Sequence, residues 1–165
     1  MPGSWLVGLI GSVLSPVVAA AEPQFALQQT ARSLPQTGDP IWLLSLHVNN
    51  QTVVQFDAVS GRAHQQDANH HQGGSLAPLP PGTYIVGKVE PLGPIDPAEL
   101  RPLWIGIERT FATGRGHLGI HLDPSANRNA YGGTLGGIGL IDPDAMADLA
   151  SLVGQRQART LQVMN

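Results

Sequence analysis

Short apolar segments, separated by turns rich in glycine and proline, limit this chain to few kinds of fold. The sequence contains 20 glycines and 14 prolines among 165 residues, a turn-rich composition that stays below the level of disordered low-complexity chains. Segments this short and this apolar favour strands over helices. The predicted strands cover residues 41–48, 52–59, 83–89, 103–110, 116–122, 137–141 and 160–164. We therefore predict a mainly β fold, a sandwich or barrel with long loops.

One segment near the C-terminus has the pattern of a helix. Asp142 is a natural N-cap, Pro143 fits the first helical position, and Gly154 is expected to end the helix. The apolar residues of this segment recur on one face, at Met146, Leu149, Ala150 and Val153. The predicted fold therefore has a single C-terminal helix.

Charge and cysteine content exclude several functions. Nine Lys and Arg against 12 Asp and Glu give a net charge of −3, so the basic excess typical of nucleic-acid-binding proteins is missing. Cysteine is absent, which excludes disulfides, thiolate metal sites and a cysteine nucleophile. His117 and His121 would lie roughly 13 Å apart on a strand, at about 3.3 Å per residue, too far to bind one metal ion together. We expect neither a metal nor a cofactor.

The N-terminal segment predicts export. Residues 5–21 carry no charge and end with Ala19 and Ala21 in the spacing of a signal-peptide cleavage site, although no basic residue precedes them. A membrane anchor at the short limit of a span and a buried core segment are the alternatives. We predict a signal peptide or hydrophobic segment over residues 1–21, a linker over 22–40 and one domain over 41–165.

The most specific pattern lies between the last two predicted strands. His121 ends one strand, Thr134, Gly136 and Gly137 follow after a loop, and sixteen residues separate His121 from Gly137. Upstream, a Ser-Gly-Arg turn at 60–62 and a Pro-Pro-Gly-Thr-Tyr-Ile strand start precede this pattern in the same chain. In this order the motifs resemble the catalytic domain of the L,D-transpeptidase (YkuD-like) family, over roughly residues 41–164.

The resemblance implies an L,D-transpeptidase-like β-sandwich or barrel and acyl transfer on peptidoglycan. In that family a cysteine thiolate attacks a stem-peptide carbonyl while a histidine takes its proton. By resemblance His121 is that histidine, Gly137 stands at the position of the nucleophile, and Gly139 replaces an arginine. The residues that the resemblance places at the substrate are His117, Thr134, Gly136 and Gly139.

Glycine has no side chain, so no thioester can form at position 137. We therefore expect a catalytically inactive cell-wall protein that binds peptidoglycan stem peptides. Two alternatives stay open: an active transpeptidase whose cysteine has been replaced in this chain, and a β-rich interaction domain without a catalytic site. The resemblance and the N-terminal run together imply a location in the periplasm or cell envelope of a bacterium, with attachment to a membrane through residues 5–21 if they are not cleaved.

Overall fold

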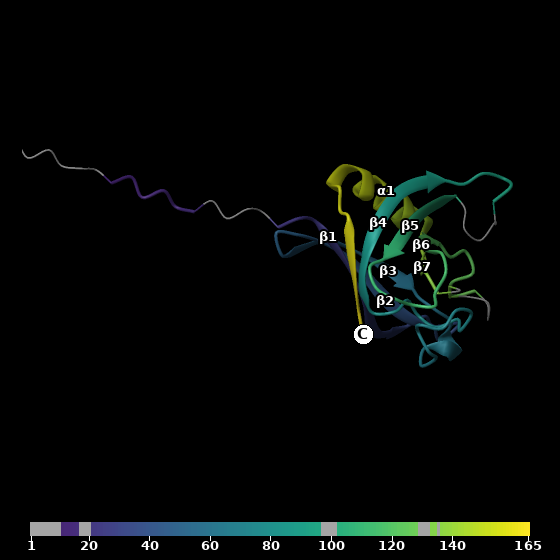
Figure 1. The fold of residues 1–165 in the computed structure, drawn as a ribbon. Helices are drawn as coiled ribbons and strands as arrows, with labels where there is room; N and C mark the ends of the chain where they lie inside the picture. Colours follow the sequence, from purple (N-terminus) through teal and green to yellow (C-terminus); the bar gives the residue numbers. More distant parts are fainter. Residues whose placement is uncertain (1–10, 17–20, 97–101, 129–132, 135) are drawn as a thin grey trace, which may run out of the picture.

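A closed β-barrel is the core of the protein. The computed structural model describes residues 11–16, 21–96, 102–128, 133–134 and 136–165. In this part of the chain, eight strands form one ring in the order β1-β2-β3-β7-β6-β5-β4-β8, and the chain has a single α-helix (Figure 1). The elements are β1 (Gln24–Ser33), β2 (Pro40–Val48), β3 (Gln51–Val59), the 3-10 helix η1 (Ala63–Gln65), β4 (Gly82–Pro91), β5 (Leu103–Arg109), β6 (Leu118–Leu122), β7 (Ile138–Leu140), α1 (Pro143–Arg156) and β8 (Thr160–Met164). The prediction of a mainly β fold with one C-terminal helix is confirmed.

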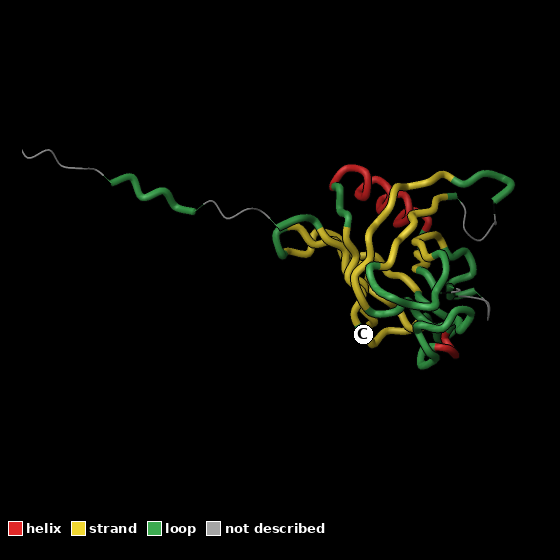
Figure 2. Tube along the Cα trace, in the orientation of Figure 1, coloured by secondary structure: helices red, strands yellow, loops and turns green. Residues whose placement is uncertain are grey.

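Two parallel strand pairs among the antiparallel ones determine where the candidate residues lie. β1 pairs with β8 in parallel, which joins the two ends of the folded chain. β6 pairs with β7 in parallel, and this register places His121 opposite Gly139. The loops that follow β3 and β6 gather on one side of the barrel (Figure 2). Residues far apart in the sequence therefore meet beside β7.

Residues 22–40 are not the linker that the sequence predicts. β1 pairs with both β2 and β8, and its Phe25 and Leu27 are completely buried. Residues Gln28 and Gln29, by contrast, are exposed, and this polar outer face hides the strand pattern in the sequence. The barrel begins at Gln24, because without β1 the ring could not close.

Helix α1 begins as predicted and ends later. Asp142 caps it, with Oδ1 accepting the N–H of Asp144 at 2.9 Å, and Pro143 takes the first helical position. The helix continues past Gly154 to Arg156, and Gln157 adopts the left-handed conformation (φ 52°) that often follows a helix. The prediction that Gly154 ends the helix is therefore wrong.

The barrel interior and the inner face of α1 share one hydrophobic core. The largest fully buried side chains include Trp42, Tyr84 and Phe25, and Met146 and Leu149 of α1 pack into the same cluster. The Tyr84 hydroxyl donates a hydrogen bond to the Pro80 carbonyl at 2.7 Å. Burial raises the pKa of Tyr84 above its ordinary value. This core holds the strands around the candidate site in fixed positions.

The predicted signal peptide lies largely outside the described residues. Residues 1–10 and 17–20 belong to the part that the structure does not describe, and residues 11–16 have no regular secondary structure. Val13 and Leu14 are exposed. No helix in the described ranges is long and apolar enough to cross a membrane.

Candidate functional site

The structure brings most of the predicted site residues to one corner of the barrel. We call this the glycine corner: Ser60 and Gly61 after β3, together with Thr134, Gly136, Gly137 and Gly139 at the start of β7. His121 is adjacent, on β6, opposite Gly139. Residues 129–132 and 135 lie outside the described residues. The predicted convergence of the histidine with the segment leading into β7 is therefore present in the backbone pairing.

Hydroxyl groups in the glycine corner are used to hold the backbone. Thr134 Oγ1 donates to the Gly137 carbonyl at 2.9 Å and accepts the N–H groups of Gly61 (3.0 Å) and Gly136 (3.1 Å). Ser60 Oγ donates to the same Gly137 carbonyl at 2.8 Å and accepts a main-chain N–H of the loop before β4. Both side chains are at most 2% exposed. Neither hydroxyl is placed to act as a nucleophile on a ligand or to contact a substrate.

Two glycines of the corner lie too close to their neighbours to carry a side chain. A Cβ at Gly137 would lie 2.5 Å from the Gly119 carbonyl oxygen of β6, a backbone atom. A Cβ at Gly139 would lie 2.9 Å from both Asp123 Cβ and Thr134 Cγ2. Real Cβ atoms essentially never approach other heavy atoms this closely. The positions of the expected nucleophile and of the expected arginine are therefore packed for glycine.

A buried arginine fills the space beside Gly136. Gly136 has φ +127°, and a Cβ there would overlap the guanidinium of Arg115. Arg115 is 4% exposed, and burial lowers its pKa. Its Nη1 donates to the carbonyls of His70 (2.9 Å), Pro78 (3.2 Å) and Ala77 (3.3 Å). Arg115 thus links the long loop after β3 to the corner.

His121 faces away from the barrel core and stacks on an indole. Its ring lies 6.0 Å from that of Trp104, at an interplanar angle of 15°. The Nδ1 atom lies 2.9 Å from the Leu122 carbonyl, so the tautomer that donates this bond carries its proton on Nδ1. Nε2 has no hydrogen-bond partner in the part of the chain that is described, and the side chain is 9% exposed.

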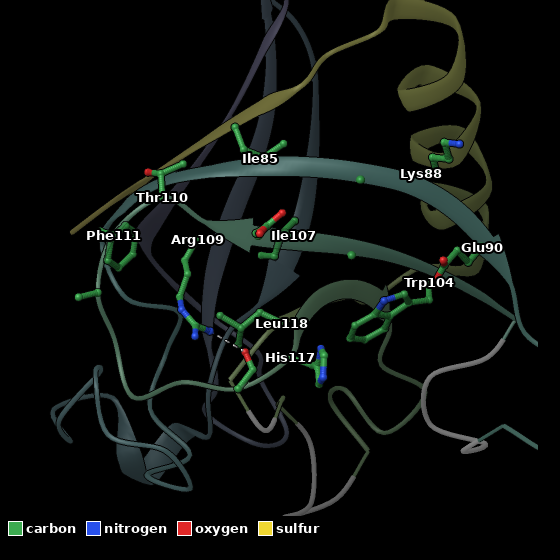
Figure 3. A pocket seen from close by; sticks show the side chains of 15 residues that line it. Ile85, Lys88, Glu90, Trp104, Ile107, Arg109, Thr110, Phe111, His117 and Leu118 are labelled. Carbon is green, nitrogen blue, oxygen red and sulfur yellow. Dashed lines mark hydrogen bonds between the residues drawn. The ribbon is translucent and has the colours of Figure 1, made fainter.

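A groove of about 770 Å³ lies on the outer face of β4, β5 and β6, and Trp104 forms part of its wall (Figure 3). Gly87 and Gly106 line it, and Gly106 lies opposite Gly119 in the β5–β6 pair. The Trp104 indole occupies the place of a Gly119 side chain, because a Cβ there would fall within the indole. At Gly106 the absence of a side chain leaves open space, since a Cβ there would meet only Trp104 Nε1, at 3.5 Å. His117, which the resemblance places at the substrate together with Thr134, Gly136 and Gly139, lines this groove, whereas the residues of the glycine corner do not.

Charged groups of both signs surround this groove. Glu90 lies beside Trp104, Lys88 is on β4 at the same end of the groove, and Arg109 lies at the other end (Figure 3). Arg109 donates to the Arg115 carbonyl at 2.6 Å. Within the described residues, Lys88, Glu90 and Glu108 form no ion pair. The groove therefore presents both carboxylates and cations to a ligand.

Two residues that shape the site are not apparent from the sequence. Trp104 lies at an outward-facing position of a strand with alternating polarity. A large aromatic residue at such a position is the sequence signal that could have identified Trp104 as part of a site. Arg115 is flanked by Gly114 and Gly116, which resembles part of a phosphate loop rather than a buried anchor. No cluster of three or more His, Asp or Glu side chains suited to a metal ion occurs in the described ranges.

Comparison with known proteins adds no relative. No family model matches the chain, and no curated protein is significantly similar to it. The resemblance to L,D-transpeptidases therefore depends on the order and spacing of the motifs.

Proposed function

We propose that this chain is a catalytically inactive L,D-transpeptidase-like domain that binds peptidoglycan stem peptides in the groove outside β4, β5 and β6. The observation that carries the proposal is the contrast between two neighbouring places. The glycine corner has no room for a nucleophilic side chain, while the groove beside His121 and Trp104 is open and charged.

The absence of a nucleophile supports the inactive state. Acyl transfer through a covalent intermediate needs a thiol or an activated hydroxyl. The chain has no cysteine, and the hydroxyls of Ser60 and Thr134 already donate to the Gly137 carbonyl. The tight contact between Gly137 and Gly119 also weighs against the alternative of an active enzyme that lost only its thiol.

The groove has the chemistry that a stem peptide requires. A stem peptide is short, extended, and carries free carboxylates together with an amine. Glu90 and Glu108 suit the amine, and Lys88, Arg109 and the exposed His117 suit the carboxylates. Its volume falls in the range of small-ligand sites. The uncharged run at 5–21 supports export to the periplasm or cell envelope, where such peptides occur.

Titration calorimetry with the tetrapeptide L-Ala–γ-D-Glu–diaminopimelate–D-Ala tests this proposal. We expect the unmodified protein to bind, and Trp104→Ala to weaken binding at least tenfold because the flat wall of the groove is lost. Val53→Ala, an exposed change on β3, is the control and should bind like the unmodified protein.

Two results would reject the proposal in different ways. Absence of tetrapeptide binding would favour an interaction domain with another partner. New 3→3 cross-links after incubation with disaccharide-tetrapeptide dimers would show that the domain is an active transpeptidase.

A further inference from the structure

We propose that the outer face of β1, β2 and β3 carries a second binding site, for one pyranose unit of an uncharged glycan chain. The site is a depression of about 200 Å³, which we call the amide dish. Its walls are formed by Ala26, Gln28, Gln29, Thr30, Leu43, Ser45, His47, Gln55 and Met164. β2 at its centre is four strands from β5 in either direction around the ring, so this inference does not depend on the stem-peptide groove.

Cross-strand pairing of small residues makes the dish hollow. Ala26 and Ser45 lie opposite each other on β1 and β2, at the centre of the outer face. Gln55 lies opposite Ser45 on β3, and Gln28 lies opposite Leu43 in the next row. Long side chains thus surround two short ones, and a depression results.

Hydrogen-bonding groups in the dish have unused capacity. Ser45 is 6% exposed, and its Oγ accepts a bond from Gln55 Nε2 at 3.2 Å, which leaves its own proton available. The side-chain amides of the exposed Gln28 and Gln29 have no hydrogen-bond partner in the described part of the chain. Each amide offers a donor and an acceptor at the same place.

Charge is missing from the dish, in contrast to the groove. None of its walls is formed by Asp, Glu, Lys or Arg. Arg32 on β1 and Asp57 on β3, which do not line the dish, are paired with each other through two hydrogen bonds with N···O distances of 2.6 and 3.0 Å. An ionic ligand therefore finds no counter-charge. An apolar ligand would leave the amides and the Ser45 hydroxyl without partners, which is unfavourable.

A sugar ring satisfies all of these conditions. Its hydroxyls donate and accept, as side-chain amides do, and its C–H faces can pack on Leu43 and Met164. The volume corresponds to about six or seven water molecules at roughly 30 Å³ each, which is enough for one ring. The remaining units of the chain would extend over the open sheet surface.

Amide chemical-shift titration of the isotopically labelled full chain tests the inference. The probes are chitotetraose, cellotetraose and maltotetraose, each up to 10 mM. We expect at least one to shift the resonances of Ser45, Gln55 and Gln28, with the corresponding monosaccharide binding more weakly. Ala26→Leu should fill the dish and weaken binding at least fivefold, whereas Ala31→Leu, which adds the same three carbons at an exposed position of β1 outside the dish, should not.

A second variant keeps the inference testable if Ala26→Leu misfolds. If Ala26→Leu does not fold, the double change Gln28→Ala and Gln55→Ala, at two exposed positions, should weaken binding by a similar factor. The inference is overturned if no probe shifts these resonances. It is also overturned if the shifts lie only around the groove, if the variants bind as well as the unmodified protein, or if the dish resonances respond to protein concentration rather than to sugar.

Discussion

Glycine has opposite consequences in the two neighbouring regions of this barrel. In the glycine corner, Gly136, Gly137 and Gly139 allow backbone and side chains from other elements to approach until no Cβ would fit. In the groove, Gly106 leaves space that nothing else fills, since a Cβ there would meet only Trp104 Nε1, at an ordinary 3.5 Å. The same residue type closes one site and opens the other.

The difference is caused by what lies opposite each glycine. Gly137 faces the backbone of β6, which cannot move without breaking the β5–β6 and β6–β7 pairs. Gly106 faces outward, into solvent-filled space on the surface of the sheet. A motif match at the level of residues therefore does not show whether a site is accessible. The surroundings of each Cα decide that.

The largest expected effect is at Gly136. Gly136→Ala should lower the free energy of unfolding by about 3–5 kcal/mol, because it adds backbone strain at φ +127° and displaces the buried Arg115. Chemical denaturation measures this. The control is Gly38→Ala, which has φ +74° but open space around it, and should cost only about 1–2 kcal/mol. Equal costs at the two positions would contradict the closed corner.

Gly137→Cys should have a smaller effect, a loss of about 1–3 kcal/mol, because the new Cβ must push back the Gly119 carbonyl. Gly116→Cys adds a thiol where no heavy atom lies within 4 Å and should cost little. Thermal denaturation compares the two. A Gly137→Cys protein that is as stable as the control, and that forms a covalent adduct with a carbapenem in intact-protein mass spectrometry, would favour an active ancestor with an intact site.

Filling the groove should affect binding rather than stability. Gly106→Leu should weaken tetrapeptide binding at least tenfold by occupying the groove. Gly106→Ala should change the free energy of unfolding by no more than about 1 kcal/mol, since alanine is at least as favourable as glycine within a strand. Calorimetric titration and thermal denaturation of both variants separate the two effects. A Gly106→Leu protein that binds as tightly as the unmodified chain would place the ligand elsewhere.

The smallest expected effect on the free energy of unfolding comes from introducing a glycine instead of replacing one. Gln157 is exposed and takes φ 52° after α1, a conformation that costs a residue with a side chain about 1–2 kcal/mol. Gln157→Gly should therefore raise the free energy of unfolding by about 1 kcal/mol or less, because glycine also loses more backbone entropy on folding. Gln155→Gly, inside the helix, is the control and should be destabilising. A loss of stability in the first variant would contradict the assigned helix end.

Much of the barrel could be predicted from local patterns. The sequence predicts strand 160–164 with its observed bounds, and the predicted strands 41–48 and 52–59 differ from β2 and β3 by one residue at the N-terminal end. β1 was missed because its outer face is rich in glutamine, and strand formation there depends on pairing with β2 and β8. Pairing partners far along the chain leave no local signal.

The candidate site was predictable only in part, for the same reason. The resemblance places His121 and Gly137 in one site, and the β6–β7 register brings their two segments together. The filling of the corner by Arg115 and the stacking of Trp104 on His121 depend on the order of strands in the ring and on the loop after β3. Neither follows from spacing along the sequence.

The contrast between a closed corner and an open groove is tested most directly by one titration. The labelled protein is titrated with the stem tetrapeptide while the Trp104 indole N–H and the amides of Gly106, Gly136, Gly137 and Gly139 are followed by NMR, with Trp104→Ala used to assign the indole signal. We predict that the indole and Gly106 signals shift in proportion to bound peptide and that the three corner amides do not. Shifts at the corner amides with an unchanged indole would contradict this account.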